Sequence, residues 1–233
     1  MGPAPLSRPE IDAALGSLPD WRLRAYALHA VYAFDTSATA IAFLADVGAA
    51  AEAADHHPDV DWRYRHVFCA STTHCAGNRV TARDTALAAR IGELAAARGG
   101  RPEPALVRGV EIAVDCTDPA ALEPVWAAAL GYRRGEGGDL VDPWRRGPSV
   151  WFQRTATPAA SRLHVDAHVA AGEAEAVLQR VRAAGAALTD ERFAPAWWVL
   201  GDGDGNRLCL CTPAPRPDDG GRAPAGGGPA PGA

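Results

Sequence analysis

The first 98 residues alternate between the two hydrophobic periods that distinguish strands from helices. In 21–34 every second residue of one face is apolar, namely Leu28, Ala30, Tyr32 and Phe34, and this period predicts a half-buried strand. In 38–55 the apolar positions recur every three or four residues, which predicts a helix. Segment 63–72 again has strand character, and 81–98 is predicted as a second long helix.

Short polar motifs mark where these helices begin and end. Ser7 and Glu10 have the spacing of a capping box, with Pro9 near the start of a short helix that runs to about residue 18. Thr81 and Asp84 form the aspartate variant of the same box. Pro58 ends the helix at 38–55, because the residue before a proline is pushed out of helical geometry.

The second half repeats one pattern, a strand and a helix followed by further strands. Its first copy has strands at 110–114, 140–141 and 150–153 and a helix that ends at Gly131; its second has strands at 163–169, 197–200 and 208–211 and a helix at 173–184. Glu111 and His164 hold equivalent places in the two copies. We therefore expect a domain at 1–98, a linker at 99–106, a second domain at 107–212 and a disordered Pro/Gly/Ala-rich tail at 213–233.

Composition narrows the classes of function that fit. The formal net charge of −5 gives nucleic-acid binding no electrostatic support. The N-terminus lacks the apolar core of a signal peptide, and no apolar run approaches the roughly 20 residues of a membrane span. The cysteine count, 5, is odd and without a zinc-finger spacing, so reduced thiols in a cytoplasm are expected. The absence of lysine, with abundant Ala, Gly and Pro, predicts a GC-rich bacterial coding sequence.

The candidate chemistry is concentrated where the helix at 38–55 ends. Glu52 and His56 are four residues apart and share a helical face, and His57 follows directly. The negative end of the helix dipole and the Glu52 carboxylate both favour protonated imidazoles, which general acid catalysis requires. His74 follows the next strand, and Asp84 opens the next helix. A single histidine at a helix end is more often a cap, and three histidines also raise the alternative of a zinc site.

This constellation resembles the signature of the pterin-4a-carbinolamine dehydratase family over roughly 6–97. The residues that carry the resemblance are Glu52, His56, His57, Pro58, Tyr64, His74 and Asp84. It implies an α+β fold in which an antiparallel sheet is backed by helices, usually as a homo-oligomer. It also implies a hydro-lyase that dehydrates 4a-hydroxytetrahydrobiopterin to quinonoid dihydrobiopterin with no metal or other cofactor. Two departures affect the shape of the pocket: Val60 stands where many members have Trp, and the loop 75–81 is slightly longer.

The resemblance also implies roles for individual residues. His56 would be the base at ring N5, and His57 and His74 would be acids for the departing hydroxyl. Glu52 and Asp84 would orient and polarise these histidines. The pterin would be bound by the three histidines together with Asp55, Thr72 and Thr73.

The second half resembles the glyoxalase-like branch of the vicinal oxygen chelate superfamily, with a βαβββ repeat. The resemblance rests on segments 110–119, 130–132, 162–166 and 202–206, and on Trp126. It makes Glu111 and His164 candidate metal ligands, but Cys209 stands at the closing carboxylate position and no fourth ligand is evident near Gln153, so no metal is assigned. For this half, the alternatives are a metal-assisted enzyme or a small-molecule binding protein, with the first domain as scaffold.

For the whole chain, the expected partners are a pterin substrate and further copies of the chain, without nucleic acid or membrane.

Overall fold

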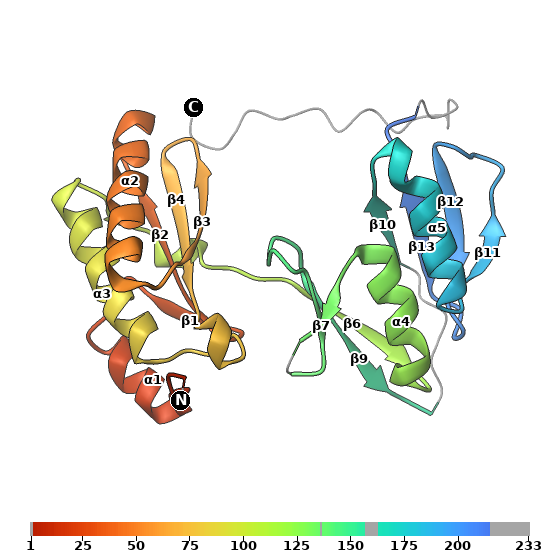
Figure 1. Ribbon diagram of the computed structural model, residues 1–233, viewed down its shortest axis with the longest axis horizontal. Coiled ribbons are helices and arrows are strands. Elements are labelled where there is room, and N and C mark those ends of the chain that lie inside the picture. Colours follow the sequence, from red (N-terminus) through yellow and green to blue (C-terminus); the bar gives the residue numbers. More distant parts are fainter. Residues whose placement is uncertain (1, 136, 157–162, 215–233) are drawn as a thin grey trace. The chain divides into compact units, whose positions relative to one another are not determined.

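The chain forms two compact units, Met1–Gly109 and Val110–Ala233, in the computed structural model (Figure 1). The residues that the structure describes are 2–135, 137–156 and 163–214. Most of the tail expected to be disordered, from 215 onward, lies outside them. The two units are described separately below.

The first unit is an antiparallel sheet backed by helices, as expected for the α+β class. Its sheet has the order β1(Arg22–Arg24), β2(Ala27–Ala33), β4(His66–Ser71) and β3(Asp59–Arg63), with β5(Arg101–Pro102) also paired to β2. Its helices are α1(Arg8–Leu15), α2(Ser37–Ala54) and α3(Ala82–Ala97). Both predicted capping boxes are present, at Ser7 and at Thr81. Segment 99–106, expected as a linker, holds β5 and the 3₁₀ turn η2(Pro104–Leu106), so it is partly tied to this sheet.

The core of this unit lies between the sheet and its helices. Phe43 of α2 has no exposed surface, and its ring lies 5.0 Å from that of Phe34 and 5.7 Å, edge-on, from that of Tyr32. Leu87 and Ile91 of α3 are buried in the same cluster. The alternating residues Leu28, Ala30, Tyr32 and Phe34 do belong to this core, but six of the seven residues of β2 are buried, so the prediction of a half-buried strand was wrong.

The segment predicted as one strand at 21–34 is a hairpin in the structure, and the strand predicted at 63–72 is the second strand of another hairpin, whose first strand is β3. The chain turns at Ala25, with φ of 49°, between β1 and β2, and at Tyr64, with φ of 54°, between β3 and β4. The prediction of one continuous strand at 21–34 was therefore wrong, and β3 was not anticipated. Neither turn carries the Gly or Asn that normally signals a left-handed backbone, so alternation alone concealed the reversals.

Helix α2 bears on the expectation that no apolar segment is long enough to span a membrane. It has 18 residues and a mean hydropathy of 1.3, so that length and composition alone would let it cross a membrane. Core helices of globular units pass the same test, and one such helix is weak evidence. In this chain Ala40, Phe43, Val47 and Ala51 of α2 are buried, three of them in the core cluster.

The second unit consists of two modules with the same topology. The first contains β6(Glu111–Cys116), α4(Pro119–Leu130), β7(Arg133–Arg134), β8(Leu140–Val141) and β9(Ser149–Arg154). The second contains β10(His164–His168), the 3₁₀ turn η3(Ala171–Glu173), α5(Ala174–Ala183), β11(Ala187–Asp190), β12(Trp197–Gly201) and β13(Arg207–Cys211). The sheet orders are β6-β9-β8-β7 and β10-β13-β12-β11, and in each the first strand runs parallel to the last. The βαβββ duplication is confirmed, although β7 and β11 were not anticipated.

A loop of the second module holds the two modules together. The Trp126 indole donates to Asp202 Oδ2 at 3.0 Å, and the Thr117 amide donates to Asp204 Oδ2 at 2.7 Å. Asp202 also accepts from the backbone amide of Asn206 at 2.9 Å. The segment 202–206 is the turn between β12 and β13, and its carboxylates take their partners from the protein.

We expect Phe43→Ala to destabilise the first unit by about 3–5 kcal/mol, because it removes a buried ring and leaves a cavity. Ile41→Ala is the matched control on the same helix: Ile41 is 48% exposed, and its truncation should cost less than about 1 kcal/mol. Urea unfolding followed by circular dichroism, fitted with one transition per compact unit, measures both. Equal shifts in the two variants would contradict this placement of the core.

Candidate active site

The end of α2 turns the chain so that two adjacent histidines have different surroundings. Asp55 caps the helix in the left-handed conformation, with φ of 46°, an unusual backbone for a residue with a side chain. The next amide, that of His56, donates back to the Ala51 carbonyl at 3.1 Å. The Arg83 guanidinium of α3 donates to the Asp55 carbonyl at 2.8 Å and fixes this reversal from outside. His56 is consequently buried, at 6% exposure, whereas His57 remains at the surface.

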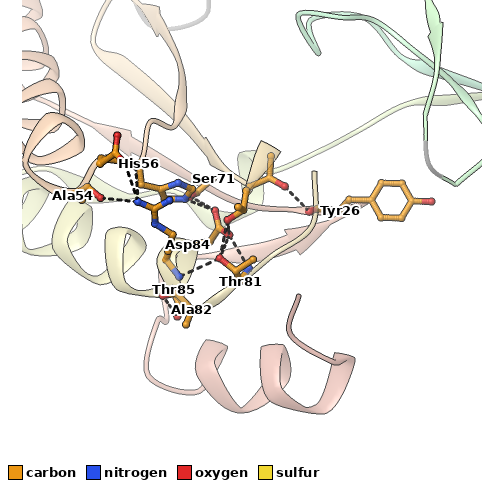
Figure 2. Close-up of polar contacts among 12 residues, drawn as sticks. Tyr26, Ala54, His56, Ser71, Thr81, Ala82, Asp84 and Thr85 are labelled. Carbon is orange, nitrogen blue, oxygen red and sulfur yellow. Dashed lines mark hydrogen bonds and ion pairs between the residues drawn. The ribbon is translucent and has the colours of Figure 1, made fainter. Parts of the chain in front are cut away.

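His56 is directed at a carboxylate that has no exposed surface. Its Nε2 lies 2.7 Å from Oδ1 of Asp84, as Figure 2 shows. Ser71, at the end of β4, donates its hydroxyl to the same oxygen at 2.7 Å. The other oxygen, Oδ2, accepts from the Thr73 hydroxyl and from the Thr81 amide, both at 2.7 Å. Segments from α2, β4 and α3 thus meet at one carboxylate.

These contacts determine the protonation of the pair. Burial by itself raises the pKa of the Asp84 carboxyl, but the hydrogen bonds to it, led by that from Thr73, outweigh burial and hold its pKa below the ordinary value. An ionised carboxylate only accepts hydrogen bonds, so Nε2 of His56 must carry the proton that joins the two. In the neutral ring, Nδ1 is then the basic nitrogen.

The other two candidate histidines lie at the surface. His57 Nε2 is 2.9 Å from Oε1 of Glu52, and the two side chains are 57% and 80% exposed. His74 is exposed in the 3₁₀ turn η1(His74–Ala76), directly after Thr73. The structure thus joins His56 to Asp84 and His57 to Glu52, and it brings His74 to the segment that supports Asp84.

The residues expected to bind the pterin have unequal positions. The side chain of Asp55 is 94% exposed, beside Arg83. Thr73 is buried, and its hydroxyl is engaged with Asp84 and Thr81. Thr72 is also buried, with its hydroxyl donating to the Tyr26 carbonyl at 3.3 Å. Both threonine hydroxyls therefore serve internal hydrogen bonds.

Sequence reasoning missed two residues of this arrangement. Ser71 had no signal beyond its place in a strand, because only the fold brings it to Asp84. Arg83 lies within the predicted capping box, but its reach back to the end of α2 spans 28 residues of sequence. Thr81 was identified as a cap, and the same spacing that makes the cap also places Asp84 in the interior.

A cavity of about 240 Å³ reaches His56 from the helical side. It is lined by α2 and α3 residues together with the ring, namely Ala50, Ala54, His56, Arg83, Ala86, Leu87 and Arg90. Its walls are mostly apolar, with two arginines. Neither His57 nor His74 lines it, so only the buried imidazole communicates with this space.

The two metal ligands that the glyoxalase-like resemblance suggests do not share a group of three potential ligands among the described residues. The Glu111 carboxylate accepts from the Ser149 hydroxyl at 3.2 Å. Two groups of potential ligands occur among the described residues, and His164 belongs to one of them, but Glu111 belongs to neither. Position 113, two residues after Glu111, is Ala, whereas position 166, two after His164, is Asp. The family arrangement built on Glu111 and His164 therefore does not fit this chain, and no step of the proposed reaction uses it.

Comparison with known proteins gives a match for each unit. The family described as Pterin 4 alpha carbinolamine dehydratase matches residues 4–94, and the family described as Glyoxalase-like domain matches 111–211. A relative from Chloroflexus aurantiacus, provisionally named a pterin-4-alpha-carbinolamine dehydratase, is 45% identical over 89 residues, 38% of this chain and 95% of the relative. One from Streptomyces coelicolor with the same provisional name is 39% identical over 95 residues, 41% of this chain and 94% of the relative.

Solved structures similar to each unit are also known. A transcriptional coactivator/pterin dehydratase from Brucella melitensis is 30% identical, with a TM-score of 0.38, and covers 39% of this chain and 98% of its own. The fosfomycin resistance protein FosX from Listeria monocytogenes is 11% identical, with a TM-score of 0.39, and covers 48% of this chain and 96% of its own. On the near-complete coverage of its curated relatives, the chain belongs through its first unit to the pterin-4a-carbinolamine dehydratase family, and it carries a glyoxalase-like domain after it.

Proposed function

We propose that the first unit dehydrates 4a-hydroxytetrahydrobiopterin to quinonoid dihydrobiopterin by histidine acid–base catalysis. The observation that carries this proposal is the buried His56–Asp84 pair, whose 2.7 Å contact fixes one nitrogen of the imidazole as the donor. In the reaction the C4a–O bond breaks, the hydroxyl leaves as water with an added proton, and N5 loses its proton as the C4a=N5 bond forms. One group must supply a proton and another must remove one.

His56 is suited to remove the N5 proton. Its Nε2–H is engaged at Asp84, which leaves Nδ1 with the lone pair that a base requires. When the ring takes up the proton, the ionised Asp84 stabilises the resulting imidazolium. Asp84 therefore acts as a positioning residue, with Ser71, Thr73 and Thr81 holding its carboxylate in place.

His57 and His74 are suited to protonate the departing hydroxyl. His57 follows the base directly in sequence and is exposed, and its Nε2 lies 2.9 Å from the Glu52 carboxylate. His74 is exposed one residue after Thr73, which is bonded to Asp84. Asp55, at the exposed cap between Glu52 and His56, is placed to bind a donor on the pterin ring.

We propose that this activity takes place in the cytoplasm of a bacterium, in a homo-oligomer that binds neither nucleic acid nor a membrane. The net charge of −5 and the bacterial origin of the curated relatives support this. The alternative assigns the main activity to the glyoxalase-like domain, as a metal-assisted enzyme or a small-molecule binder with the first unit as scaffold. Glu111 accepts a hydrogen bond from Ser149 and belongs to neither group of potential metal ligands, which does not favour this alternative.

The direct test is an assay of the full chain with freshly generated 4a-hydroxytetrahydropterin. We expect the quinonoid product to form faster than in buffer alone, without added metal and in the presence of a chelator. A rate equal to that of buffer would reject the dehydratase assignment, and a rate that a chelator abolishes would reject its metal-free chemistry.

We expect His56→Ala, His57→Ala and His74→Ala each to lower the turnover number at least tenfold, since an acid or base in the transition state contributes about 10²–10⁴-fold. His66→Ala is the matched control, because His66 lies at the opposite end of β4 from Ser71 and contacts Glu103 at 3.4 Å. Steady-state kinetics, with circular dichroism to verify folding, measure all four variants. Wild-type turnover in the His56 and His74 variants would contradict the assignment.

We expect Asp84→Asn to lower turnover more than tenfold and to reduce the acid sensitivity of folding. The folded pKa of Asp84 lies below the unfolded value of about 3.9, so its ionised form contributes stability that is complete above pH 4 and is lost as pH falls through the folded pKa. The difference in unfolding free energy between wild type and variant, on the order of 3 kcal/mol near neutrality, should therefore shrink below pH 4.

Urea denaturation at pH 5 and at pH 3 measures this difference, in a range below the ordinary titration of imidazole. Asp12→Asn provides the control, because the Asp12 carboxylate is 52% exposed and pairs only with Arg8 across one helical turn. If Asp84→Asn and Asp12→Asn changed stability equally at both pH values, the buried network would not have the role given to it.

A further inference from the structure

One sheet face of the second unit carries a row of metal-binding side chains. Strands β10 and β13 are parallel and in register, so that Asp166 lies opposite Cys209 and His168 opposite Cys211. Alternate residues of a strand share a face, which places His164, Asp166 and His168 beside Cys209 and Cys211. On the other face, Leu208 and Leu210 are buried in the core cluster that includes Val177 and Val181 of α5. We call these five residues the β10–β13 ladder.

The ligand atoms of the ladder converge in two overlapping groups of three. Those of His164, Asp166 and Cys209 all lie within 4.8 Å of one another, and so do those of Asp166, His168 and Cys211. Ligands of a tetrahedral zinc ion are about 3.3–3.8 Å apart, from bond lengths of about 2.0–2.3 Å. Small side-chain movements would therefore close either group around an ion. Both sulfurs are thiols and not parts of disulfides.

The charge around these thiols is suited to a cation. Burial, and after it the neighbouring Asp166 and Cys211, together raise the pKa of Cys209 to about 11. Deprotonating the thiol beside Asp166 would place two negative charges together. A bound divalent cation removes this penalty, because it favours the thiolate as its ligand.

We propose that the β10–β13 ladder binds one thiophilic divalent cation of the zinc type, with Asp166 as the ligand common to both groups. A thiolate, an imidazole and a carboxylate are all ligands of zinc, and three protein ligands leave a fourth position for water or an added ligand. Because Asp166 belongs to both groups, an ion in one group engages the carboxylate that the other group requires, and one ion per chain is expected. The site lies within the second module alone and excludes Glu111, unlike the pair that the family resemblance suggested.

The first module serves as an internal comparison for this site. Its strands β6 and β9 have the same register, with Glu111 opposite Ser149 as His164 is opposite Arg207. The positions equivalent to Asp166 and Cys209 are Ala113 and Trp151, which supply no ligand atom. The two modules share a backbone arrangement, but only the second has a carboxylate and a thiol at these two positions. The ladder therefore depends on the side chains and not on the fold.

The test is titration of the chelator-treated full chain with Zn²⁺ by calorimetry, and with Co²⁺ by absorption spectroscopy. We expect one ion per chain, release of about one proton for each thiol that binds, and a thiolate-to-cobalt charge-transfer band. Asp166→Asn should weaken Zn²⁺ binding at least tenfold, and the double variant Cys209→Ser/Cys211→Ser should abolish the cobalt band. The single serine variants show which group of three holds the ion.

Two variants exclude other sources of the signal. Cys75→Ser removes the exposed thiol next to His74 in the first unit, and Glu111→Gln removes the ligand suggested by the family. Both should bind Zn²⁺ as the wild type does, and circular dichroism verifies the folding of every variant. Absence of Zn²⁺ binding, a cobalt band that survives loss of both thiols, or loss of binding in Glu111→Gln would each overturn the proposal. These readouts are independent of the dehydratase assay.

Discussion

A carboxylate without exposed surface is tolerated only where donors surround it, and in the first unit that condition applies to Asp84. Its donors come from the ends of α2 and β4 and from the cap of α3, so satisfying one charge fixes the relative positions of three elements. The hydrophobic core could accept small shifts of these elements at modest cost, but the hydrogen bonds at 2.7 Å could not. The same constraint orients His56, and so ties the proposed chemistry to the stability of the unit.

The sequence predicted the helices and their caps and placed His56 and His57 at the end of α2, because each of these depends on local spacing. Thr81 and Asp84 form the expected cap, and the reversal after Glu52 lies where Pro58 required the helix to end. What spacing could not reveal was that the cap carboxylate faces inward and meets Ser71, 13 residues away in sequence. The turns at Ala25 and Tyr64 were missed for a related reason: tertiary pairing imposes a left-handed backbone there without the usual turn residues.

The second unit shows how far a repeated backbone can differ in chemistry. Its two modules share strand order, the parallel pairing of first and last strands, and the register at Glu111 and His164. The sequence therefore predicted the duplication correctly from periodicity alone. It did not predict that Glu111 would bond to Ser149 while His164 joined a group with Asp166, because that outcome depends on the residues opposite each strand.

Asp84 and Asp166 represent two solutions to the same electrostatic problem. Asp84 is neutralised from within: hydroxyl and amide donors engage both of its oxygens, and the one imidazole among them donates a proton, so no ion is needed. The neighbours of Asp166 are the His164 imidazole, 3.3 Å away, and the Cys209 thiol, and both of these groups coordinate metals when deprotonated. A carboxylate surrounded by donors needs no ion to balance its charge, whereas one surrounded by potential ligands can share a cation with them. This difference in partners is why we propose metal-free acid–base chemistry for the first unit and a cation site for the second.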